Sequence, residues 1–358
     1  MDVIELLAQV KEMGASDLHL SSGSPAMARI NGEMTPIDTG TMLPDDIHFM
    51  IYDIMDDEQK KRFEEFKELD FSRQLGNVAR FRVNVFFKNG GEAAVFRTIP
   101  TKVLTFEQLN LPPIVKQLSE KEKGMVLVTG PTGSGKSTTL AAMIDFINRT
   151  RKGHILTVED PIEFVHETRM CMVNQREVGP HTLSFANALK SALREDPDVI
   201  LVGEMRDLET ISLAITAAET GHLVFGTLHT SSAGKTVDRI IDVFPTNQQA
   251  QIRAMFSESI EGVVAQKLLP KKDGGRVAAL EIMLGTTAIR NLIREGKTFQ
   301  IPSMIQTGQA LGMQSLDQAL KHLVESGEIE PEVALGYAFD PKSFAQIVGL
   351  PQPSDGPQ

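Results

Sequence analysis

The sequence contains a single cysteine, Cys171, and no apolar stretch that could span a bilayer. One thiol cannot form a disulfide within the chain, and it cannot supply a cysteine-rich zinc site. No apolar run approaches the roughly 20 residues that a spanning helix needs. The first residues also lack the basic and apolar regions of a secretory signal. We therefore expect a cytoplasmic protein that associates with membranes only through partners.

Basic residues are scarce relative to acidic ones. The 358 residues include 36 Lys and Arg against 47 Asp and Glu, which gives a net charge of −11. Sequence-independent DNA binding depends on a basic surface. No segment combines basic and aromatic residues in the kind of stripe that holds a single strand. The composition argues against nucleic acid as a partner. An acidic net charge is still compatible with a basic central channel, if the chain assembles into a ring.

Residues 1–100 predict a small α+β domain with an antiparallel sheet. Its clearest strand is residues 78–87, where apolar and polar residues alternate, and residues 93–99 return after a Gly-rich turn. The segment that follows is rich in proline, and we interpret residues 101–115 as a linker that packs.

Residues 116–350 predict an α/β domain, because strands alternate with helices as they do around a mostly parallel sheet. The expected strands are residues 125–129, 154–158, 199–202 and 223–228. Beyond residue 247 the pattern predicts mainly helices, at residues 248–264, 288–295 and 315–325. Residues 351–358 are expected to form a disordered tail.

A phosphate-binding loop follows the first strand of this domain. The sequence GPTGSGKS at residues 130–137 matches the pattern G-x-x-x-x-G-K-[ST]. Glycines allow positive φ and a close approach to phosphate, and the start of the next helix presents amide donors to an anion. The residues predicted to bind a nucleoside triphosphate are Gly130, Pro131, Thr132, Gly133, Ser134, Gly135, Lys136, Ser137 and Thr138. Among them, Lys136 is expected to reach the β- and γ-phosphates, and Ser137 to bind Mg²⁺.

Acidic residues or histidines follow the other strands, at the edge where an open α/β sheet binds its ligand. Glu204 ends an apolar strand, so we predict that it holds Mg²⁺ directly or through water. His229 follows the last strand and is predicted to sense the γ-phosphate. His222 precedes that strand and either contributes to the site or only caps the helix before it.

Three carboxylates compete for the role of general base after the strand at residues 154–158. They are Glu159, Asp160 and Glu163. Pro161 fixes the local turn and could aim Glu163 back at the site, so we predict that Glu163 activates the attacking water.

Arginines stand out in the sheet of the first domain. Arg80 and Arg82 alternate with apolar residues, which is typical of a solvated sheet face. Arg97 lies among apolar residues and therefore requires a partner. Alternatively, these arginines reach a catalytic site in another domain or subunit, where an arginine can stabilise the charge of a transition state.

Taken together, these motifs resemble the secretion ATPases of the type II and type IV pilus superfamily, and most closely the pilus retraction ATPases. The resemblance covers residues 1–350. The motifs are ASDLHL (15–20), RFRVNVF from Arg80, GPTGSGKST (130–138), ILTVEDPIE (155–163), DVILVGEMRD (198–207), GHLVFGTLHT (221–230) and AIRNLI (288–293).

The resemblance implies a RecA-like P-loop NTPase core with an N-terminal PAS-like domain, and a hexameric motor that uses ATP and Mg²⁺. It implies that Glu163 is the catalytic base, that Lys136, Glu204 and His229 act at the same site, and that Arg82 and Arg97 act in trans. The implied location is the cytoplasmic face of the inner membrane, where a pilus platform protein embedded in the membrane is the partner. Residues 288–293 match a motif of retraction ATPases, although their spacing also fits an ordinary core helix.

The assembly ATPases of this superfamily usually add an N-terminal docking domain and a tetracysteine zinc motif. We expect neither in this sequence, in which Cys171 is the single cysteine, and we therefore expect retraction and not assembly. The remaining alternatives are an accessory retraction ATPase, an assembly ATPase, a RecA-like nucleic-acid translocase and a ring that binds nucleotide without turnover.

Overall fold

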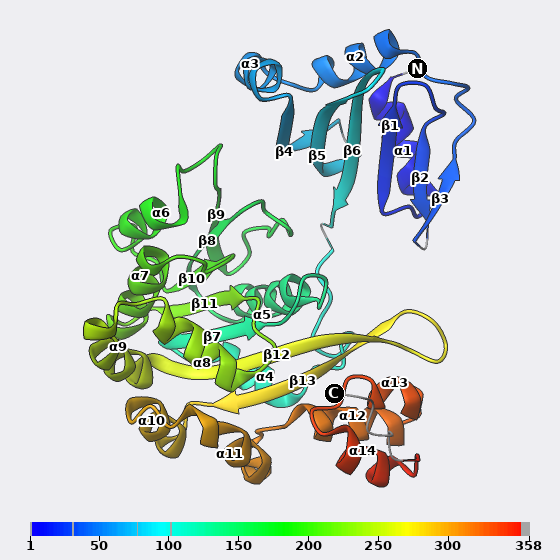
Figure 1. Ribbon diagram of the computed structural model, residues 1–358. Coiled ribbons are helices and arrows are strands. Elements are labelled where there is room, and N and C mark those ends of the chain that lie inside the picture. Colours follow the sequence, from blue (N-terminus) through cyan, green and yellow to red (C-terminus); the bar gives the residue numbers. More distant parts are fainter. Residues whose placement is uncertain (1, 31, 77, 101, 352–358) are drawn as a thin grey trace. The chain divides into compact units, whose positions relative to one another are not determined.

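The computed structural model describes residues 2–30, 32–76, 78–100 and 102–351, so all of the predicted tail except Pro351 lies outside the described residues. The described chain forms two compact units (Figure 1). The first contains the residues up to Lys102 together with Pro161–Val165, and the second contains the remainder. Within the described ranges, no helix is both long enough and apolar enough to cross a bilayer.

The first unit is built on an antiparallel sheet of six strands in the order β3-β2-β1-β6-β5-β4. Because side chains alternate along each strand, one face collects apolar residues, which pack against three helices in a single core. The strands are β1 (Asp17–Ser21), β2 (Met27–Ile30), β3 (Glu33–Pro36), β4 (Glu68–Leu75), β5 (Ala79–Lys88) and β6 (Gly91–Ile99), and the helices are α1 (Val3–Glu12), α2 (Pro44–Asp53) and α3 (Asp57–Phe66). The predicted antiparallel sheet is therefore present.

The second unit contains a sheet of seven strands in the order β13-β12-β7-β11-β10-β8-β9. Its strands are β7 (Gly124–Thr129), β8 (Gly153–Glu159), β9 (Cys171–Glu177), β10 (Val199–Val202), β11 (Leu223–Leu228), β12 (Ile260–Pro270) and β13 (Arg276–Leu284). All neighbouring pairs run parallel except β12 and β13. The prediction of an α/β core with a mostly parallel sheet is confirmed.

Helices cover both faces of this sheet, because alternate residues of its central strands point to opposite sides. Leu127, Leu156 and Ile200 belong to one core, with helices from residues 185–307, whereas Val126, Ile155 and Leu201 belong to the other, with helices from residues 113–150. The helices that form these two layers are α4 (Pro113–Ser119), α5 (Lys136–Thr150), α6 (Phe185–Ala192), α7 (Leu208–Glu219), α8 (Ala233–Asp242), α9 (Thr246–Ser259), α10 (Thr287–Arg294) and α11 (Ile301–Thr307).

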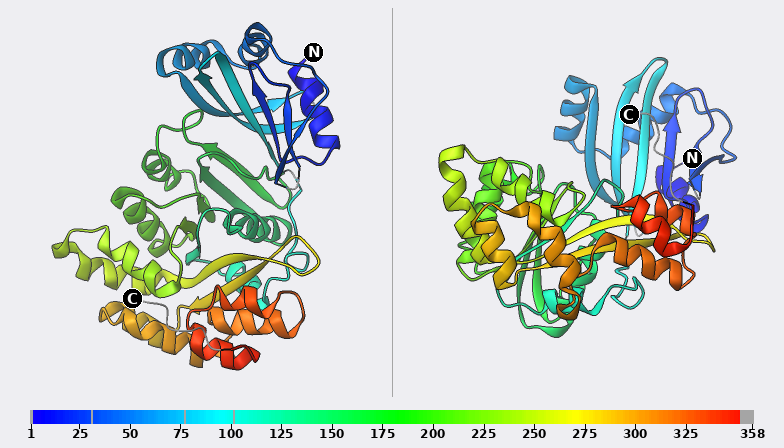
Figure 2. Two further views of the ribbon diagram at one scale, coloured as in Figure 1. Left: turned by 45° about the vertical axis from the view of Figure 1, so that its right-hand side comes forward. Right: turned by 60° about the horizontal axis from the view of Figure 1, so that its bottom comes forward.

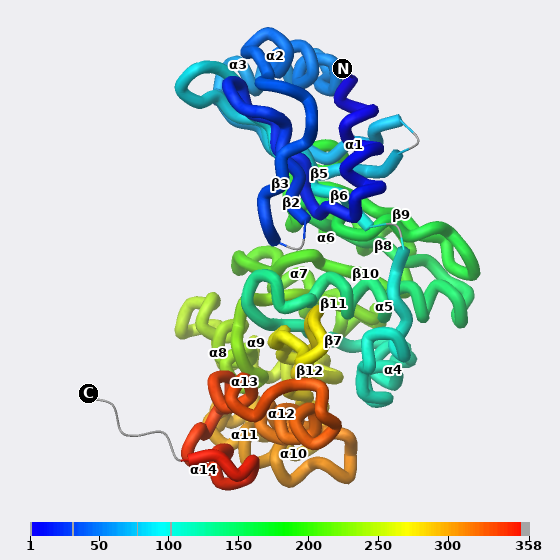
Figure 3. Tube along the Cα trace, turned by 90° about the vertical axis from the view of Figure 1, so that its right-hand side faces the viewer, coloured from blue at the N-terminus to red at the C-terminus, as the bar shows by residue number. Residues whose placement is uncertain are grey.

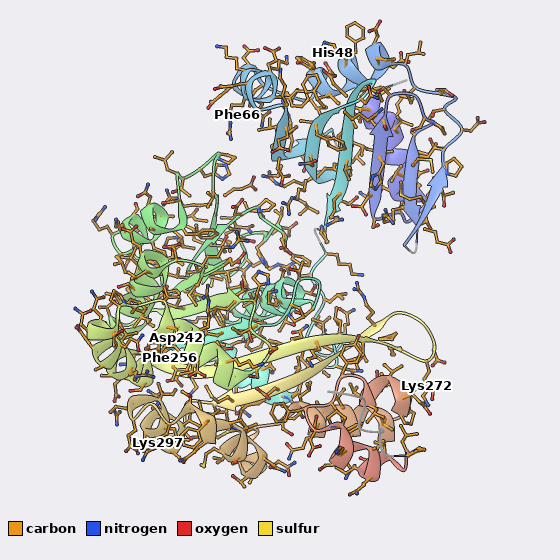
Figure 4. All side chains as sticks on the ribbon, viewed as in Figure 1. His48, Phe66, Asp242, Phe256, Lys272 and Lys297 are labelled. Atoms are coloured by element: carbon orange, nitrogen blue, oxygen red, sulfur yellow. The ribbon has the colours of Figure 1, made fainter. Side chains whose placement is uncertain are left out.

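The largest correction concerns the segment after residue 247. The helix predicted over residues 248–264 ends at Ser259, and the chain continues as the strands β12 and β13, which form a long hairpin (Figure 2, yellow). Lys272 lies in the turn between them (Figure 4). The run of valines and leucines after residue 260 fits either a buried helix or a buried strand by its spacing alone, and the extension of the parallel sheet decides in favour of the strand.

A smaller helical group follows the hairpin. It consists of α12 (Leu316–Glu325), α13 (Pro331–Leu335) and α14 (Pro341–Val348), preceded by the short 3₁₀ segments η1 (Thr298–Gln300) and η2 (Gln309–Leu311). Figure 3 shows these last helices gathered together at the end of the second unit. Their apolar residues form a separate core with β12 and β13, through Leu269 and Ala279.

Candidate active site

The phosphate-binding loop connects β7 to α5, as its sequence predicts. Three of its glycines have positive φ: Gly130 at 143°, Gly133 at 77° and Gly135 at 87°. Residues other than glycine rarely adopt a positive φ, so the bend depends on glycine. Lys136 begins α5, and its Nζ donates to the carbonyl oxygens of Gly130 at 2.9 Å and Pro131 at 3.1 Å. The lysine therefore lies over the loop, with Ser137 and Thr138 half-buried in the first helical turn.

Glu204 and His229 come together at the ends of neighbouring strands. Strands β10 and β11 pair in parallel, so the residues that follow them emerge at the same edge of the sheet. His229 Nε2 lies 3.1 Å from Glu204 Oε1, and Arg206 Nη2 donates to Glu204 Oε2 at 2.5 Å. The side chain of Glu204 is 19% exposed, whereas those of Arg206 and His229 are 74% and 44% exposed. The carboxylate is thus the inner member of the cluster.

Electrostatics keep this carboxylate ionised. Burial by itself raises the pKa of Glu204, but the hydrogen bond and charge of Arg206 oppose burial, and His229 and Lys136 add to them. The net result is a pKa for Glu204 below its ordinary value. An ionised oxygen ligand is what Mg²⁺ prefers, so the state of Glu204 suits the predicted role.

The phosphate loop belongs to the same edge of the sheet. Strand β11 pairs with β7, and Leu228 is the partner of Thr129, so His229 and Gly130 both follow paired strand ends. A chain of hydroxyl groups joins the two sides: Thr230 Oγ1 lies 2.7 Å from Thr236 Oγ1, which lies 3.4 Å from Thr129 Oγ1. The structure therefore brings Lys136, Glu204 and His229 to one site.

The three acids after β8 have different environments. Glu159 is buried, and its Oε1 accepts hydrogen bonds from Thr157 Oγ1 at 2.6 Å and Gln175 Nε2 at 3.2 Å. These bonds stabilise the end of β8 and make Glu159 the weakest of the three candidates for a general base. Asp160 and Glu163 are exposed, and Glu163 belongs to the Pro161–Val165 segment of the first unit. Its role as the base stays a prediction.

The predicted arginines lie side by side in the first unit. Arg82 of β5 pairs with Arg97 of β6, which in turn pairs with Asp17 of β1. Arg97 Nε donates to Asp17 Oδ1 at 2.7 Å, and Arg82 Nη2 donates to Asp70 Oδ2 at 2.5 Å. Asp17 is only 3% exposed, so it is the buried partner that Arg97 requires. Whether either arginine acts in trans stays a prediction.

Two motifs turn out to be partly structural. His222 Nδ1 lies 2.9 Å from the carbonyl oxygen of Ala217, so this histidine contacts the last turn of α7. Within the AIRNLI segment, Ile289 and Ile293 are fully buried. Arg290 of the same helix bonds to the carbonyl oxygens of Gly285 and Ser257 and to the carboxylate of Glu261. Most of the motif therefore fastens α10 to the core.

One residue of the loop's surroundings was missed from the sequence. Gln266 lies on β12, two residues beyond the helix predicted over residues 248–264, and its side chain contacts the phosphate loop. Nothing in the local pattern separates this glutamine from a surface residue of a helix. The two runs of apolar residues around the turn at residues 271–275 would have indicated a hairpin.

The residues of the site fit a nucleotide with Mg²⁺. The loop is open at Gly133, where a Cβ atom would meet no neighbouring atom within 4 Å. Among the described residues, no cluster of three or more His, Cys, Asp or Glu could hold a metal ion alone. Mg²⁺ is commonly held by one or two protein oxygens together with phosphate oxygens and water, and Ser137 and Glu204 supply such oxygens.

Comparison with known proteins gives evidence on the family of this chain that is independent of the geometry of the site. The family described as type II/IV secretion system protein matches residues 3–275. The pilus retraction ATPase PilT of Pseudomonas aeruginosa is 61% identical over 344 residues, which are 96% of this chain and 100% of that protein. A twitching motility protein of Neisseria gonorrhoeae is 58% identical over 89% of this chain and 86% of its own length. A crystal structure of the pilus retraction motor PilT with bound ADP has a TM-score of 0.91 and 48% identity, covering 96% of this chain and 98% of that one.

Proposed function

Because the chain belongs to the family of type II/IV secretion system proteins, we propose that it is an ATP-hydrolysing motor that powers retraction of a type IV pilus. The observation that carries the proposal is the phosphate-binding loop with Lys136, next to the ionised Glu204 and its partner His229. The relatives named for pilus retraction and twitching motility support the mechanical output.

The proposed reaction is the in-line attack of water on the γ-phosphate. The loop amides and Lys136 bind the phosphates and offset the charge that develops on them. The Ser137 hydroxyl and Glu204, directly or through water, would hold Mg²⁺, which would supply further positive charge at the phosphates. His229 touches the same carboxylate, so a change at the γ-phosphate can reach β11 and the start of α8.

Three residues of the first unit have proposed roles in the reaction. Glu163 orients the attacking water, and Arg82 and Arg97 stabilise the transition state, either within one subunit or from a neighbour. Both arginines are already held by aspartates on the same sheet face, which limits the conformations from which they can engage phosphate. Motion of the first unit over the second would couple hydrolysis to mechanical work.

The proposed assembly is a homohexamer at the cytoplasmic face of the inner membrane. Its partner is a pilus platform protein embedded in that membrane, and nucleic acid is not a partner. The acidic net charge of the chain supports this choice.

The test combines ATP hydrolysis by the purified protein with motility of the cells. Lys136→Ala and Glu204→Ala should each lower kcat by roughly 100-fold or more, because each removes a charge at the reacting phosphates. Lys321→Ala is the matched control, since Lys321 is half-exposed on α12 and its ion pair with Glu325 is a surface pair of little energetic value. Near wild-type turnover in either site variant would refute the assignment of the site.

In cells, deletion of the gene should abolish twitching while pili accumulate on the surface. The wild-type gene should restore motility, and the Lys136→Ala gene should not. Retained motility after deletion would indicate an accessory role, and loss of surface pili would indicate assembly instead of retraction. Strong stimulation of turnover by single-stranded DNA would favour a translocase.

A further inference from the structure

Strand β12 passes directly alongside the phosphate loop. Ala265 of β12 pairs with Thr129, the last residue of β7, so the next residue, Gln266, lies beside Gly130. Gln266 is 3% exposed, and both ends of its amide group are bonded. Its Nε2 donates to the carbonyl oxygen of Ser134 at 2.7 Å, and its Oε1 accepts from Thr139 Oγ1 at 2.8 Å. One buried side chain therefore joins the loop to the helix that follows it.

Two glycines of the loop make room for this strand. A Cβ atom placed on Gly130 would lie 2.3 Å from the carbonyl oxygen of Gln266. A Cβ atom placed on Gly135 would lie 2.8 Å from Nε2 of the same residue. The loop thus approaches Gln266 more closely than residues with a Cβ atom could without a shift of the neighbouring atoms.

The bond to Ser134 has a consequence for the phosphate site. A trans peptide unit is planar, and its C=O and N–H groups point in opposite directions. Because the Ser134 carbonyl points at Gln266, the N–H group of Gly135 points away from β12. Gly135 has a φ of 87°, and glycine can rotate this peptide plane at little steric cost. The hydrogen bond from Gln266 to the Ser134 carbonyl opposes that rotation and keeps the N–H group of Gly135 directed away from β12.

We propose that Gln266 is a positioning residue that holds the peptide between Ser134 and Gly135, so that the N–H group of Gly135 faces the nucleotide's phosphates. The inference rests on the proposed function, because it takes the phosphates of a nucleotide as the ligand of the loop. Gln266 itself touches no reacting atom, and it acts through the backbone of the loop.

Three variants of the full-length chain test this role. Gln266→Met has a similar volume and lacks both hydrogen bonds. Gln266→Glu can still accept from Thr139 but cannot donate to Ser134 when it is ionised. Thr139→Val removes only the hydroxyl donor and leaves the bond to Ser134 intact, so it is the matched control.

The measurements are the Kd of ADP with Mg²⁺ and the kcat and KM for ATP. Both Gln266 variants should weaken ADP binding by about tenfold or more, which corresponds to about 1.4 kcal/mol, and the KM for ATP should rise with it. Thr139→Val should bind ADP within about threefold of the wild type, because the Ser134 carbonyl keeps its partner. A purely structural role would instead lower the folded fraction, and with it the apparent kcat, without changing Kd or KM.

Several outcomes overturn the proposal. One is a folded Gln266 variant that binds ADP with wild-type affinity. Another is a Thr139→Val protein that loses as much ADP affinity as the Gln266 variants. If neither Gln266 variant folds while Thr139→Val does, the role is structural only. ADP binding is measured separately from hydrolysis, so a wild-type protein that binds ADP but neither hydrolyses ATP nor retracts pili would refute the proposed function and leave this comparison intact.

Discussion

Replacement of Ile289 by alanine should destabilise the second unit and should not act mainly through a partner surface. The side chain of Ile289 is fully buried in the core that α10 shares with Phe256 of α9. Truncation of a buried isoleucine to alanine costs about 2–5 kcal/mol, because packing contacts are lost and a cavity remains. For a unit of this size, that cost lowers the melting temperature by roughly 4–20 °C.

The assay is thermal unfolding with and without ADP, followed by ATP hydrolysis well below the melting temperature. Asn291→Ala is the matched control on the same helix, because Asn291 is exposed and its side chain accepts a hydrogen bond from the exposed Arg294. The control should melt close to the wild type. If it keeps its ATPase activity and loses retraction, the exposed face of α10 carries the coupling. An Ile289→Ala protein that melts like the wild type would refute the assignment of Ile289 to the core.

Three further predictions follow from the site and its surroundings. Arg206→Ala should raise the pKa of Glu204, because the hydrogen bond and charge of Arg206 oppose the effect of burial; the acidic limb of the pH profile of kcat/KM should therefore move to higher pH. Burial lowers the pKa of His166 to about 4, so below about pH 6.5 the unfolded chain binds a proton that the folded chain does not. Unfolding free energy should therefore fall by about 3 kcal/mol as pH drops from about 6.5 to about 4, and urea titrations of the wild type and His166→Gln should diverge over that range. Gly130→Ala should weaken ADP binding and lower stability, because the added methyl group would lie 2.3 Å from the Gln266 carbonyl oxygen. In Gly133→Ala the methyl group meets no neighbour, so its unfolding free energy should fall only by the roughly 1–2 kcal/mol that left-handed backbone strain costs. Calorimetry of the two variants measures the difference.

Each of these predictions has an outcome that contradicts it. An unchanged acidic limb in Arg206→Ala would mean that Arg206 does not control Glu204. Parallel stability curves for the wild type and His166→Gln would mean that His166 titrates normally in the folded state. Equal damage from the Gly130 and Gly133 substitutions would mean that backbone strain, and not the contact with β12, explains the need for glycine.

The parts of the site that could be predicted from sequence are those that depend on local patterns. Lys136 lies in a loop whose spacing alone specifies a strand, a tight bend and a helix. Glu204 and His229 could be predicted to meet because each follows a short apolar strand, and parallel strands end at the same edge. The distance between them could not be predicted, but their proximity follows from the topology.

The remaining features depend on contacts between residues far apart in the chain. The sequence indicates that Arg97 requires a partner, but Asp17 lies 80 residues earlier and pairs with it only through the register of β1 and β6. Gln266 is 132 residues from Ser134. The helix predicted over residues 248–264 includes the start of the same strand, because a short apolar run fits a buried helix or a buried strand equally well. The pairing of β12 with β7 and β13 decides in favour of the strand, in agreement with the hairpin signal around residues 271–275.

The position of Gln266 depends on an irregularity in β12. Ile260 pairs with Met125 and Gly262 pairs with Val126, so Glu261 is one extra residue in the strand. A shift of one residue turns every following side chain to the other face; without this bulge the side chain of Gln266 would point away from the loop.

Glu261 is itself held in place from outside the strand. Arg290 Nη2 bonds to its Oε1 at 2.7 Å, and Lys121 Nζ lies 2.9 Å from its Oε2. The arginine of the AIRNLI segment therefore contacts the residue that sets the register of the strand beside the phosphate loop. The AIRNLI segment and the loop predicted to bind nucleotide thus both contact β12, the first at the bulge and the second at Gln266.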